Sequence, residues 1–241
     1  MDFFKTNKTR FISHRGFTPL APENSLPSFS YAGKFSQWAI ETDLHLTKDG
    51  HIVCCHNDSL DAYCDYGGKI IDMSLMDIKK RKIVKGNRVG CFSDDELRIP
   101  TFFEYLNVCK KYGSIPFIEL KTNDVDRILF YLKQQGFSHE NTIISSISLD
   151  YLKQVRDIDK NMFIHWIFAD ENQLEAFSNL KNAGVSLNYA DAKSCPTKNI
   201  IKAKDLGLKI CLRACDNVEN LNYMQKINLD YLPTNCLHDK L

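Results

Sequence analysis

The chain has 241 residues, of which 44% are hydrophobic and 25% charged, and its formal net charge is +1. This composition is typical of a globular protein, and the balanced charge argues against a general nucleic-acid binder, which would carry a basic stripe or an extreme pI. The length suits one α/β barrel, so we expect a single domain over residues 1–241.

Cysteine usage and the amino-terminal residues indicate the compartment. The nine cysteines are odd in number and include no C-x-x-C pair, which argues against a disulfide framework and against a zinc site. Residues 1–10 lack the apolar stretch of a signal peptide, and no apolar run is long enough to span a membrane. We therefore expect free thiols, a cytoplasmic location and no stable membrane insertion, while the sequence leaves the oligomeric state open.

Short apolar runs alternate with segments of helical periodicity along the chain. The expected strands are 11–13, 39–43, 116–120, 142–146, 162–168, 185–189, 208–212 and 231–233. The helices expected between them are 25–33, 101–112, 124–135, 149–156, 171–182, 197–206 and 218–227. Eight strands separated by helices predict an α/β fold, a TIM-like (β/α)8 barrel.

A long insertion follows the second strand. Asp49-Gly50 is a strong hairpin turn signal, so residues 44–56 are expected to rise from this strand and return to it. The hairpin and a cap segment together occupy about residues 44–98. An insertion of this size, on the face where barrels place active sites, is expected to cover or shape a pocket. A packed helix explains its apolar residues better than a lipid contact does; these residues are Ile70, Ile71, Met73, Leu75 and Met76.

Three acidic residues are expected at the carboxyl ends of two strands. Glu41 and Asp43 are two positions apart and therefore face the same side of their strand. Glu119 ends the apolar run that begins at residue 116, and Lys121 follows two positions later. Buried carboxylates need a cation or strong hydrogen bonds. This cluster suits one divalent cation, Mg²⁺, Ca²⁺ or Mn²⁺, and Lys121 adds a point charge for an anionic group nearby.

Two histidines are expected beside these acids. His14 and Arg15 end the first strand, Gly16 permits a tight turn there, and the hairpin returns His56 to the level of Asp43. Imidazoles suit acid–base chemistry near neutral pH, and a guanidinium can bind phosphate oxygens as a fork. Each of these motifs alone is more often structural. The functional interpretation depends on all of them falling at the carboxyl ends of neighbouring strands.

The order of these motifs resembles that of the glycerophosphodiester phosphodiesterase family. The resemblance covers nearly the whole chain, is strongest over residues 11–121, and becomes weaker at Ile144-Ser145-Ser146 and over residues 231–234. The strong matches are His14-Arg15-Gly16, Pro22-Glu23-Asn24-Ser25, Glu41-Thr42-Asp43, Thr47-Lys48-Asp49-Gly50, His56, Ile99-Pro100-Thr101 and Glu119-Leu120-Lys121.

The resemblance implies a TIM-like barrel with a small insertion after the second strand. It also implies hydrolysis of a small glycerophosphodiester to glycerol 3-phosphate and an alcohol, with one divalent cation held by Glu41, Asp43 and Glu119. The glycerol 2-hydroxyl is a plausible internal nucleophile. Two alternatives stay open: a lysophospholipase D-like enzyme that acts on a lipid, and a barrel that binds phosphoglycerol without turnover.

The same resemblance implies roles for the remaining site residues. His14 and His56 would be the acid–base pair, and Arg15 and Lys121 would bind the phosphate. Glu23 would lie near the metal or the glycerol and contribute to substrate binding.

Three departures from the family pattern bear on the alcohol side of the pocket. Asn57 and Ala62 stand where the family usually has Asp and Arg, and Arg213-Ala214 stand where it often has Trp-Thr. Arg213 therefore offers an additional cation for a phosphate or an anionic head group.

Replacement of Arg213 by alanine should raise the KM for anionic diesters more than the KM for choline diesters, because only the anionic head group loses an opposite charge. Steady-state kinetics on both substrates measures this. Equal increases in KM would contradict the role of Arg213.

Overall fold

Eight parallel strands form the centre of the molecule. The computed structural model describes residues 9–187, 189, 194–212, 214, 215, 217–227 and 229–235. Its strands are β1 (Arg10–Ser13), β2 (Ala39–Leu46), β3 (Ile52–Cys54), β4 (Ile115–Leu120), β5 (Ile143–Ser146), β6 (Phe163–Ala169), β7 (Ala183–Leu187), β8 (Lys209–Cys211) and β9 (Tyr231–Thr234). The parallel strands follow the order β8-β7-β6-β5-β4-β2-β1-β9, and β3 pairs with β2.

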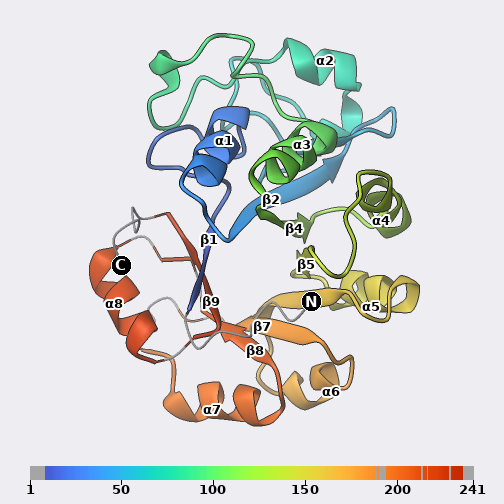
Figure 1. Cartoon of the computed structure of the whole chain (residues 1–241). Helices are drawn as coiled ribbons and strands as arrows, with labels where there is room; N and C mark the ends of the chain where they lie inside the picture. The colour runs from blue at the N-terminus through green and yellow to red at the C-terminus, as the bar shows by residue number, and fades with distance from the viewer. Residues whose placement is uncertain are drawn as a thin grey trace.

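The sheet curls until its two edge strands meet. Near β8 and β9, the N–H of Asp230 donates to the carbonyl of Ile210 at 3.0 Å, and the N–H of Cys215 donates to the carbonyl of Pro233 at 2.9 Å. The strands therefore enclose a nearly closed barrel, and the helices lie around it (Figure 1). The predicted (β/α)8 architecture is confirmed.

Several helices begin where the sequence offers a capping side chain. Ser25 and Thr101 each form a capping box at the start of a helix, and Ser148 accepts a hydrogen bond from the N–H of Tyr151. The helices are α1 (Leu26–Lys34), α2 (Leu75–Lys80), α3 (Phe102–Tyr112), α4 (Val125–Gln134), α5 (Leu149–Ile158), α6 (Leu174–Ser178), α7 (Thr197–Asp205) and α8 (Val218–Lys226), with 3-10 turns η1 (Ile70–Asp72) and η2 (Val89–Cys91). Within the described ranges, no helix has both the length and the apolar character needed to cross a membrane.

One predicted helix–strand pair was misplaced. The helix expected over 171–182 is confined to α6, and the strand expected over 185–189 is β7, which begins two residues earlier. Gly184, which lies between the helix and the strand expected here, is part of β7. A Cβ there would come 2.2 Å from the Tyr231 hydroxyl, so the glycine provides space for a large side chain inside the barrel.

The insertion begins with the predicted hairpin. Leu44 pairs with Cys54, and the N–H of Cys55 donates to the carbonyl of Asp43 at 3.0 Å, which returns the chain to the end of β2. Thr47 accepts a hydrogen bond from the N–H of Gly50 in the turn. The predicted hairpin is therefore present, in a register that brings Cys55 to Asp43 and leaves His56 one residue beyond it.

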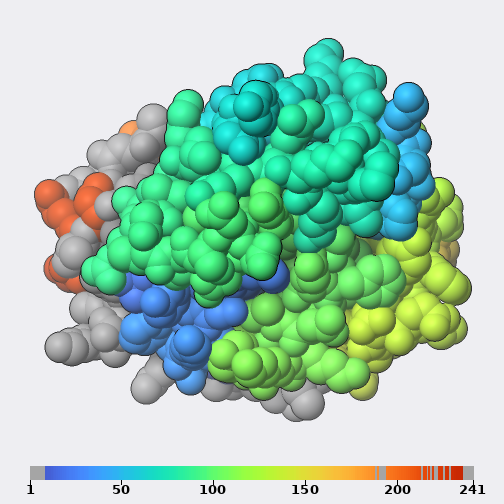
Figure 2. All heavy atoms as spheres, turned by 90° about the horizontal axis from the view of Figure 1, so that it is seen from above, coloured from blue at the N-terminus to red at the C-terminus, as the bar shows by residue number. Residues whose placement is uncertain are grey.

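The rest of the insertion packs around a small core of its own, whose buried members are Val53, Cys55, Leu60, Cys64, Ile70, Ile78, Ile83, Leu97 and Ile99. It lies beside α1 and α3 (Figure 2). The contacts include a Phe92–Tyr31 ring pair and a Lys79–Glu104 ion pair. Of the residues considered for lipid contact, Ile70 is buried, whereas the Ile71 and Met76 side chains are exposed. In place of one packed helix, these residues lie on or beside the 3-10 turn η1 and the short helix α2.

A histidine lies among the large side chains inside the barrel. His165 of β6 is buried, its Nδ1 contacts the Tyr231 hydroxyl, and its Nε2 lies 3.9 Å from Cys211 Sγ. Burial lowers the pKa of His165 from 6.5 to about 3. The imidazole is therefore neutral in the folded protein at every pH at which the chain is expected to work. These contacts are those of a residue packed inside the barrel.

The depressed pKa makes stability depend on pH with a definite sign. Between pH 6.5 and 3 the unfolded chain binds a proton at His165 that the folded chain does not bind, so stability falls as the pH falls. This one group should remove about 2 kcal/mol of unfolding free energy between pH 7 and pH 5. Urea unfolding of the wild type and of His165→Gln at both pH values measures the difference, since glutamine does not titrate. An unchanged pH dependence in the variant would contradict this account.

Candidate active site

Three buried carboxylates converge at the carboxyl ends of two adjacent strands. Glu41 and Asp43 both face inward from β2, and β4 runs beside it in a register that places Glu119 opposite Asp43. One oxygen atom from each carboxylate lies within 4.8 Å of the others. The three residues are buried, with exposed fractions of 6%, 0% and 8%. The strand register therefore brings together the acids that the sequence singled out.

Burial and mutual repulsion disfavour full ionisation of this cluster. Burial, together with Asp43 and Glu119, raises the pKa of Glu41 well above its ordinary value, and burial with Asp43 raises that of Glu119 to about 7. Burial also opposes ionisation of Asp43, but the charges of Lys121 and Arg15 hold its pKa below the ordinary value. Lys121 Nζ lies 3.3 Å from Asp43 Oδ1 and also contacts Glu119. The cluster thus demands more positive charge than these two cations supply.

The loop after β1 is shaped to place a guanidinium beside the acids. Gly16 has a φ of +84°, and a Cβ there would come 2.3 Å from Ser28 Oγ, so the predicted tight turn requires glycine. Arg15 also has a positive φ, +58°, and its N–H donates to Glu41 Oε2 at 2.7 Å. Its Nη1 donates to Glu23 Oε1 at 3.0 Å. Glu23 therefore contacts the arginine that was expected to bind phosphate.

A neighbouring asparagine organises the acids and was not singled out from the sequence. Asn24 Nδ2 donates to Asp43 Oδ2 at 3.0 Å, and Asn24 Oδ1 accepts from Thr42 Oγ1 at 2.7 Å. All three residues are buried. Asn24 has a φ of +47°, a conformation that asparagine tolerates better than most residues. The sequence feature that could have identified Asn24 was its position in the Pro22-Glu23-Asn24-Ser25 motif, between Glu23 and the capping Ser25.

Each of the two predicted histidines is oriented by an asparagine. His14 Nδ1 lies 3.1 Å from Asn235 Oδ1, which also accepts a hydrogen bond from Thr18 Oγ1 at 3.2 Å. His56 Nδ1 lies 2.8 Å from Asn57 Oδ1. An amide oxygen only accepts, so each pairing requires the hydrogen on Nδ1 and leaves Nε2 able to accept a proton.

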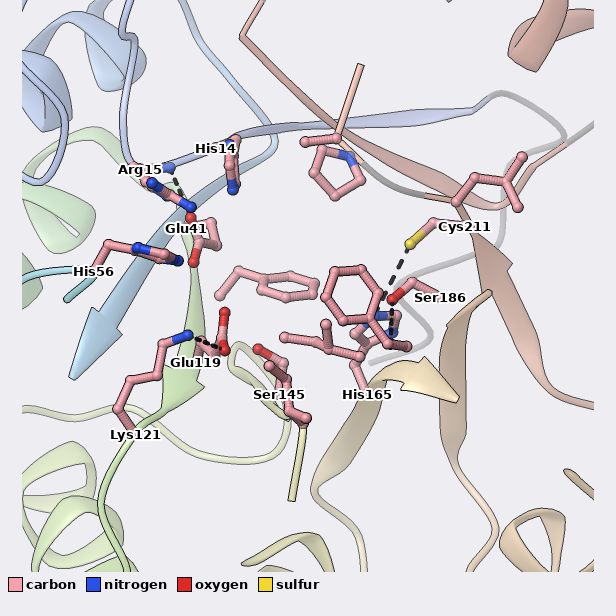
Figure 3. Close-up of a pocket in the computed structure, with 17 residues that line it drawn as sticks. His14, Arg15, Glu41, His56, Glu119, Lys121, Ser145, His165, Ser186 and Cys211 are labelled. Carbon is pink, nitrogen blue, oxygen red and sulfur yellow. Dashed lines mark hydrogen bonds and ion pairs between the residues drawn. The ribbon is translucent and has the colours of Figure 1, made fainter. Parts of the chain in front are cut away.

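The environment of His14 favours its neutral form. Burial, followed by the charge of Arg15, lowers the pKa of His14 from 6.5 to about 4. A neutral imidazole with a free Nε2 can act as a general base near neutral pH. Figure 3 shows His14 and His56 on either side of Glu41, with both rings directed toward the same space.

These side chains line one side of a cavity of about 180 Å³ at the barrel mouth. Six of the eight predicted site residues line it, namely His14, Arg15, Glu41, His56, Glu119 and Lys121. His56 is the one described lining residue that comes from the insertion. The other side is mostly apolar and is formed by β5 to β9; its residues include Ile147, Ile167, Phe168, Leu212, Ala214 and Pro233. Arg213, for which the sequence predicted a substrate contact, lies outside the described residues.

Comparison with known proteins decides the family. The model of the glycerophosphoryl diester phosphodiesterase family matches residues 14–235, which contain every predicted site residue. The chain belongs to this family. It is 30% identical over 167 residues to the glycerophosphodiester phosphodiesterase of Caldanaerobacter subterraneus, covering 67% of each chain. It is 31% identical over 110 residues to mouse glycerophosphodiester phosphodiesterase 1, a match that spans 46% of this chain and 33% of that protein.

Solved structures of similar proteins have the same fold. A phosphodiesterase from Oleispira antarctica, in complex with its product sn-glycerol-3-phosphate, superposes with a TM-score of 0.84 at 23% identity and covers 95% of this chain and 93% of that chain. An enzyme from Agrobacterium tumefaciens superposes with a TM-score of 0.78 at 20% identity, covering 94% and 96%. The chain is thus a member of a hydrolase family with the TIM-barrel fold that its sequence predicted.

The Asn24 contacts can be tested without any assay of activity. Asn24→Ala leaves Asp43 Oδ2 and Thr42 Oγ1 without these buried partners and should lower the unfolding free energy by about 2 kcal/mol in the presence of chelator. Ser36→Ala is a matched control, because Ser36 also has a left-handed backbone, with a φ of +53°, but is exposed. Urea unfolding measures both. Equal effects of the two variants would assign the loss to the backbone and contradict the role of the side chain.

Proposed function

We propose that this chain hydrolyses glycerophosphodiesters to glycerol 3-phosphate and an alcohol at the site formed by β1, β2, β4 and the hairpin. One observation carries the proposal: three buried carboxylates lie beside two histidines, each with its Nδ1 atom paired to an amide oxygen. This arrangement combines a cation-binding cluster with two groups that can exchange protons. The product named for the Oleispira antarctica neighbour, sn-glycerol-3-phosphate, agrees with the proposed reaction.

The donor set fits one divalent cation. The site contains four carboxylates, those of Glu41, Asp43, Glu119 and Glu23, but only two cations, Arg15 and Lys121. When all six groups are ionised, two negative charges remain in formal excess. Hard divalent ions such as Mg²⁺, Ca²⁺ and Mn²⁺ prefer oxygen ligands of this kind. Glu41, Asp43 and Glu119 would hold the cation, and when bound it would lower the pKa of a nearby hydroxyl and neutralise charge on the phosphate.

The side chains of the chain itself would position and protonate the substrate. Arg15 and Lys121 would bind the phosphate oxygens, and Glu23 would keep the Arg15 guanidinium in place, which is its contribution to substrate binding. One imidazole, His14 or His56, would accept the proton of the glycerol 2-hydroxyl at Nε2 as that oxygen attacks phosphorus. The other, protonated at Nε2, would donate that proton to the leaving alcohol oxygen, and a cyclic phosphodiester would form. Water would then attack this phosphorus and break its bond to the 2-oxygen, with the two histidines exchanging roles, which gives glycerol 3-phosphate.

Apart from His56, the insertion would act by positioning the hairpin and not by contact with the substrate. Asp49 accepts a hydrogen bond from the N–H of Leu75 at 2.9 Å and so attaches the hairpin turn to the start of α2. Thr47 Oγ1 donates to Asp49 at 2.7 Å. The insertion would therefore serve to fix the hairpin, and through it His56, at the edge of the site.

The test is release of glycerol 3-phosphate from glycerophosphocholine, glycerophosphoethanolamine and glycerophosphoglycerol, with Mg²⁺, Ca²⁺ or Mn²⁺ and with chelator. We expect chelator to abolish release and His14→Ala to lower kcat by roughly a hundredfold or more, because a general acid or base contributes 10²–10⁴-fold. His51→Ala is the control, because that ring is mostly exposed on the hairpin.

Two outcomes would contradict the proposal. Release that survives both chelator and His14→Ala would remove the metal and the histidine from the mechanism. No release from any of the three diesters by folded, cation-loaded protein would favour a lipid substrate or a barrel that binds phosphoglycerol without turnover.

A further inference from the structure

Two successive residues of β6 face the cavity. Side chains alternate between the two faces of a strand. In β6, His165 faces the interior, Trp166 packs outward against Phe177 of α6, and Ile167 faces the cavity. Phe168 should therefore point outward, but it also lines the cavity.

A β-bulge causes this exception. The pairing of β6 with β7 is regular as far as Trp166 and Val185 and resumes at Ala169 and Leu187, so β6 contains one extra residue. Phe168 lies within this interval and has a φ of +56°. Bulky side chains rarely adopt a positive φ, and bulges beside active sites commonly redirect a side chain. The bulge therefore turns the Phe168 ring into the cavity at a conformational cost.

Hydrogen bonds fix the two segments that carry Phe168 and Ile147 at the mouth of the cavity. The N–H of Phe168 donates to Ser186 Oγ at 3.2 Å, which fixes the bulge to β7. At the end of β5, the carbonyl of Ile147 accepts a hydrogen bond from Trp166 Nε1 at 3.1 Å. The exposed fractions are 38% for Phe168 and 53% for Ile147, so two large apolar side chains remain open to the cavity and to solvent.

The charge on the cavity wall is divided between its two sides. The carboxylates and cations lie on β1, β2 and β4 or directly after them. The described lining residues of β5 to β9 and the segments that follow these strands include no Asp, Glu, Lys or Arg. Figure 3 shows the same division, with Glu41, Glu119 and Lys121 on one side and Ser186 and Cys211 on the other.

The geometry of phosphoryl transfer connects this division to the substrate. The attacking and leaving oxygens lie on opposite sides of phosphorus, roughly in line. If the glycerol 2-hydroxyl attacks from the carboxylate side, the leaving alcohol extends toward Phe168 and Ile147. We propose that these two residues bind the leaving alcohol and that Phe168 selects diesters with an apolar alcohol over those with a quaternary ammonium. This inference rests on the proposed function and assigns the substrate class of the same site.

Physical chemistry favours the apolar alcohol. A quaternary ammonium that enters this side loses water without meeting a carboxylate among the described lining residues. The face of one aromatic ring compensates such a cation only partly, because sites that recognise quaternary ammonium groups surround it with several rings. An alkyl group, in contrast, gains from removing the exposed surfaces of Phe168 and Ile147 from water.

A matched pair of substrates tests the inference. Glycerophosphocholine and its carbon isostere, the 3,3-dimethylbutyl diester of glycerol phosphate, have the same shape but differ by one positive charge. For the wild type we expect kcat/KM to be roughly tenfold higher for the dimethylbutyl diester, because discrimination by one side of a pocket is of this order. Phe168→Gly should reduce this preference to about twofold or less, since it removes the ring. Glycine also adopts the positive φ without strain, so the bulge can be kept.

Two further variants separate recognition from structure. Phe168→Leu should keep most of the preference, because the side chain stays apolar. Phe130→Ala should leave it unchanged, because Phe130 is an exposed aromatic residue of α4 that does not line the cavity. The ratio of the two kcat/KM values is the readout, since a purely structural defect lowers both values together.

The outcomes also distinguish this inference from the proposed function. Equal turnover of both diesters by the wild type, or an unchanged ratio in Phe168→Gly, would overturn the role of Phe168 and leave the phosphodiesterase activity established. Failure of the wild type to release glycerol 3-phosphate from either diester would overturn both.

Discussion

The burial of three carboxyl groups at one end of the barrel is the constraint on which the rest of the site depends. Glu41, Asp43 and Glu119 are held together by strand register, which side-chain rotation alone cannot undo. Uncompensated burial of charge costs several kcal/mol, so neighbouring groups must supply positive charge and hydrogen bonds. The barrel can tolerate this cluster because the surrounding segments direct two cations and several hydrogen-bond donors at it, which offset part of its charge.

Those loops adopt backbone conformations that most residues avoid. Arg15, Gly16 and Asn24 all have positive φ values within one short connection between β1 and α1. The turn directs the N–H of Arg15 and the amide of Asn24 at two different carboxylates. The strain is local, and the capping box at Ser25 fixes the following helix directly behind it. The strained backbone is therefore found in the loop that places polar groups beside the buried carboxylates, as expected for a functional site.

Much of this arrangement could be predicted from the sequence because strand periodicity and strand ends carry the information. Glu41 and Asp43 share a face by their spacing, and the Asp49-Gly50 turn fixes the level to which His56 returns. The fold followed from the same alternation of apolar runs and helical segments. These features are local in sequence, so no knowledge of packing was needed to infer them.

What could not be predicted depends on contacts between distant segments. Asn235 orients His14 from the last described residue of the barrel, 221 positions away, and nothing near either residue indicates the pairing. The early start of β7 was missed because Gly184 is needed for space beside Tyr231, a reason that is visible only in three dimensions. The bulge at Phe168 was hidden for a similar reason, since an apolar run reads as a regular strand whether or not a residue is added.

The two sides of the cavity are therefore subject to different physical constraints. On the side of β1, β2 and β4, each change of charge alters the balance of a buried cluster, so substitution of one residue affects all the others. On the side of β5 to β9, the described lining residues interact with a ligand mainly through shape and apolar surface. Substitutions there change which group fits and leave the charge balance intact. In the reaction that we propose, a single barrel can thus preserve its chemistry at one set of strand ends while its choice of alcohol varies at the other.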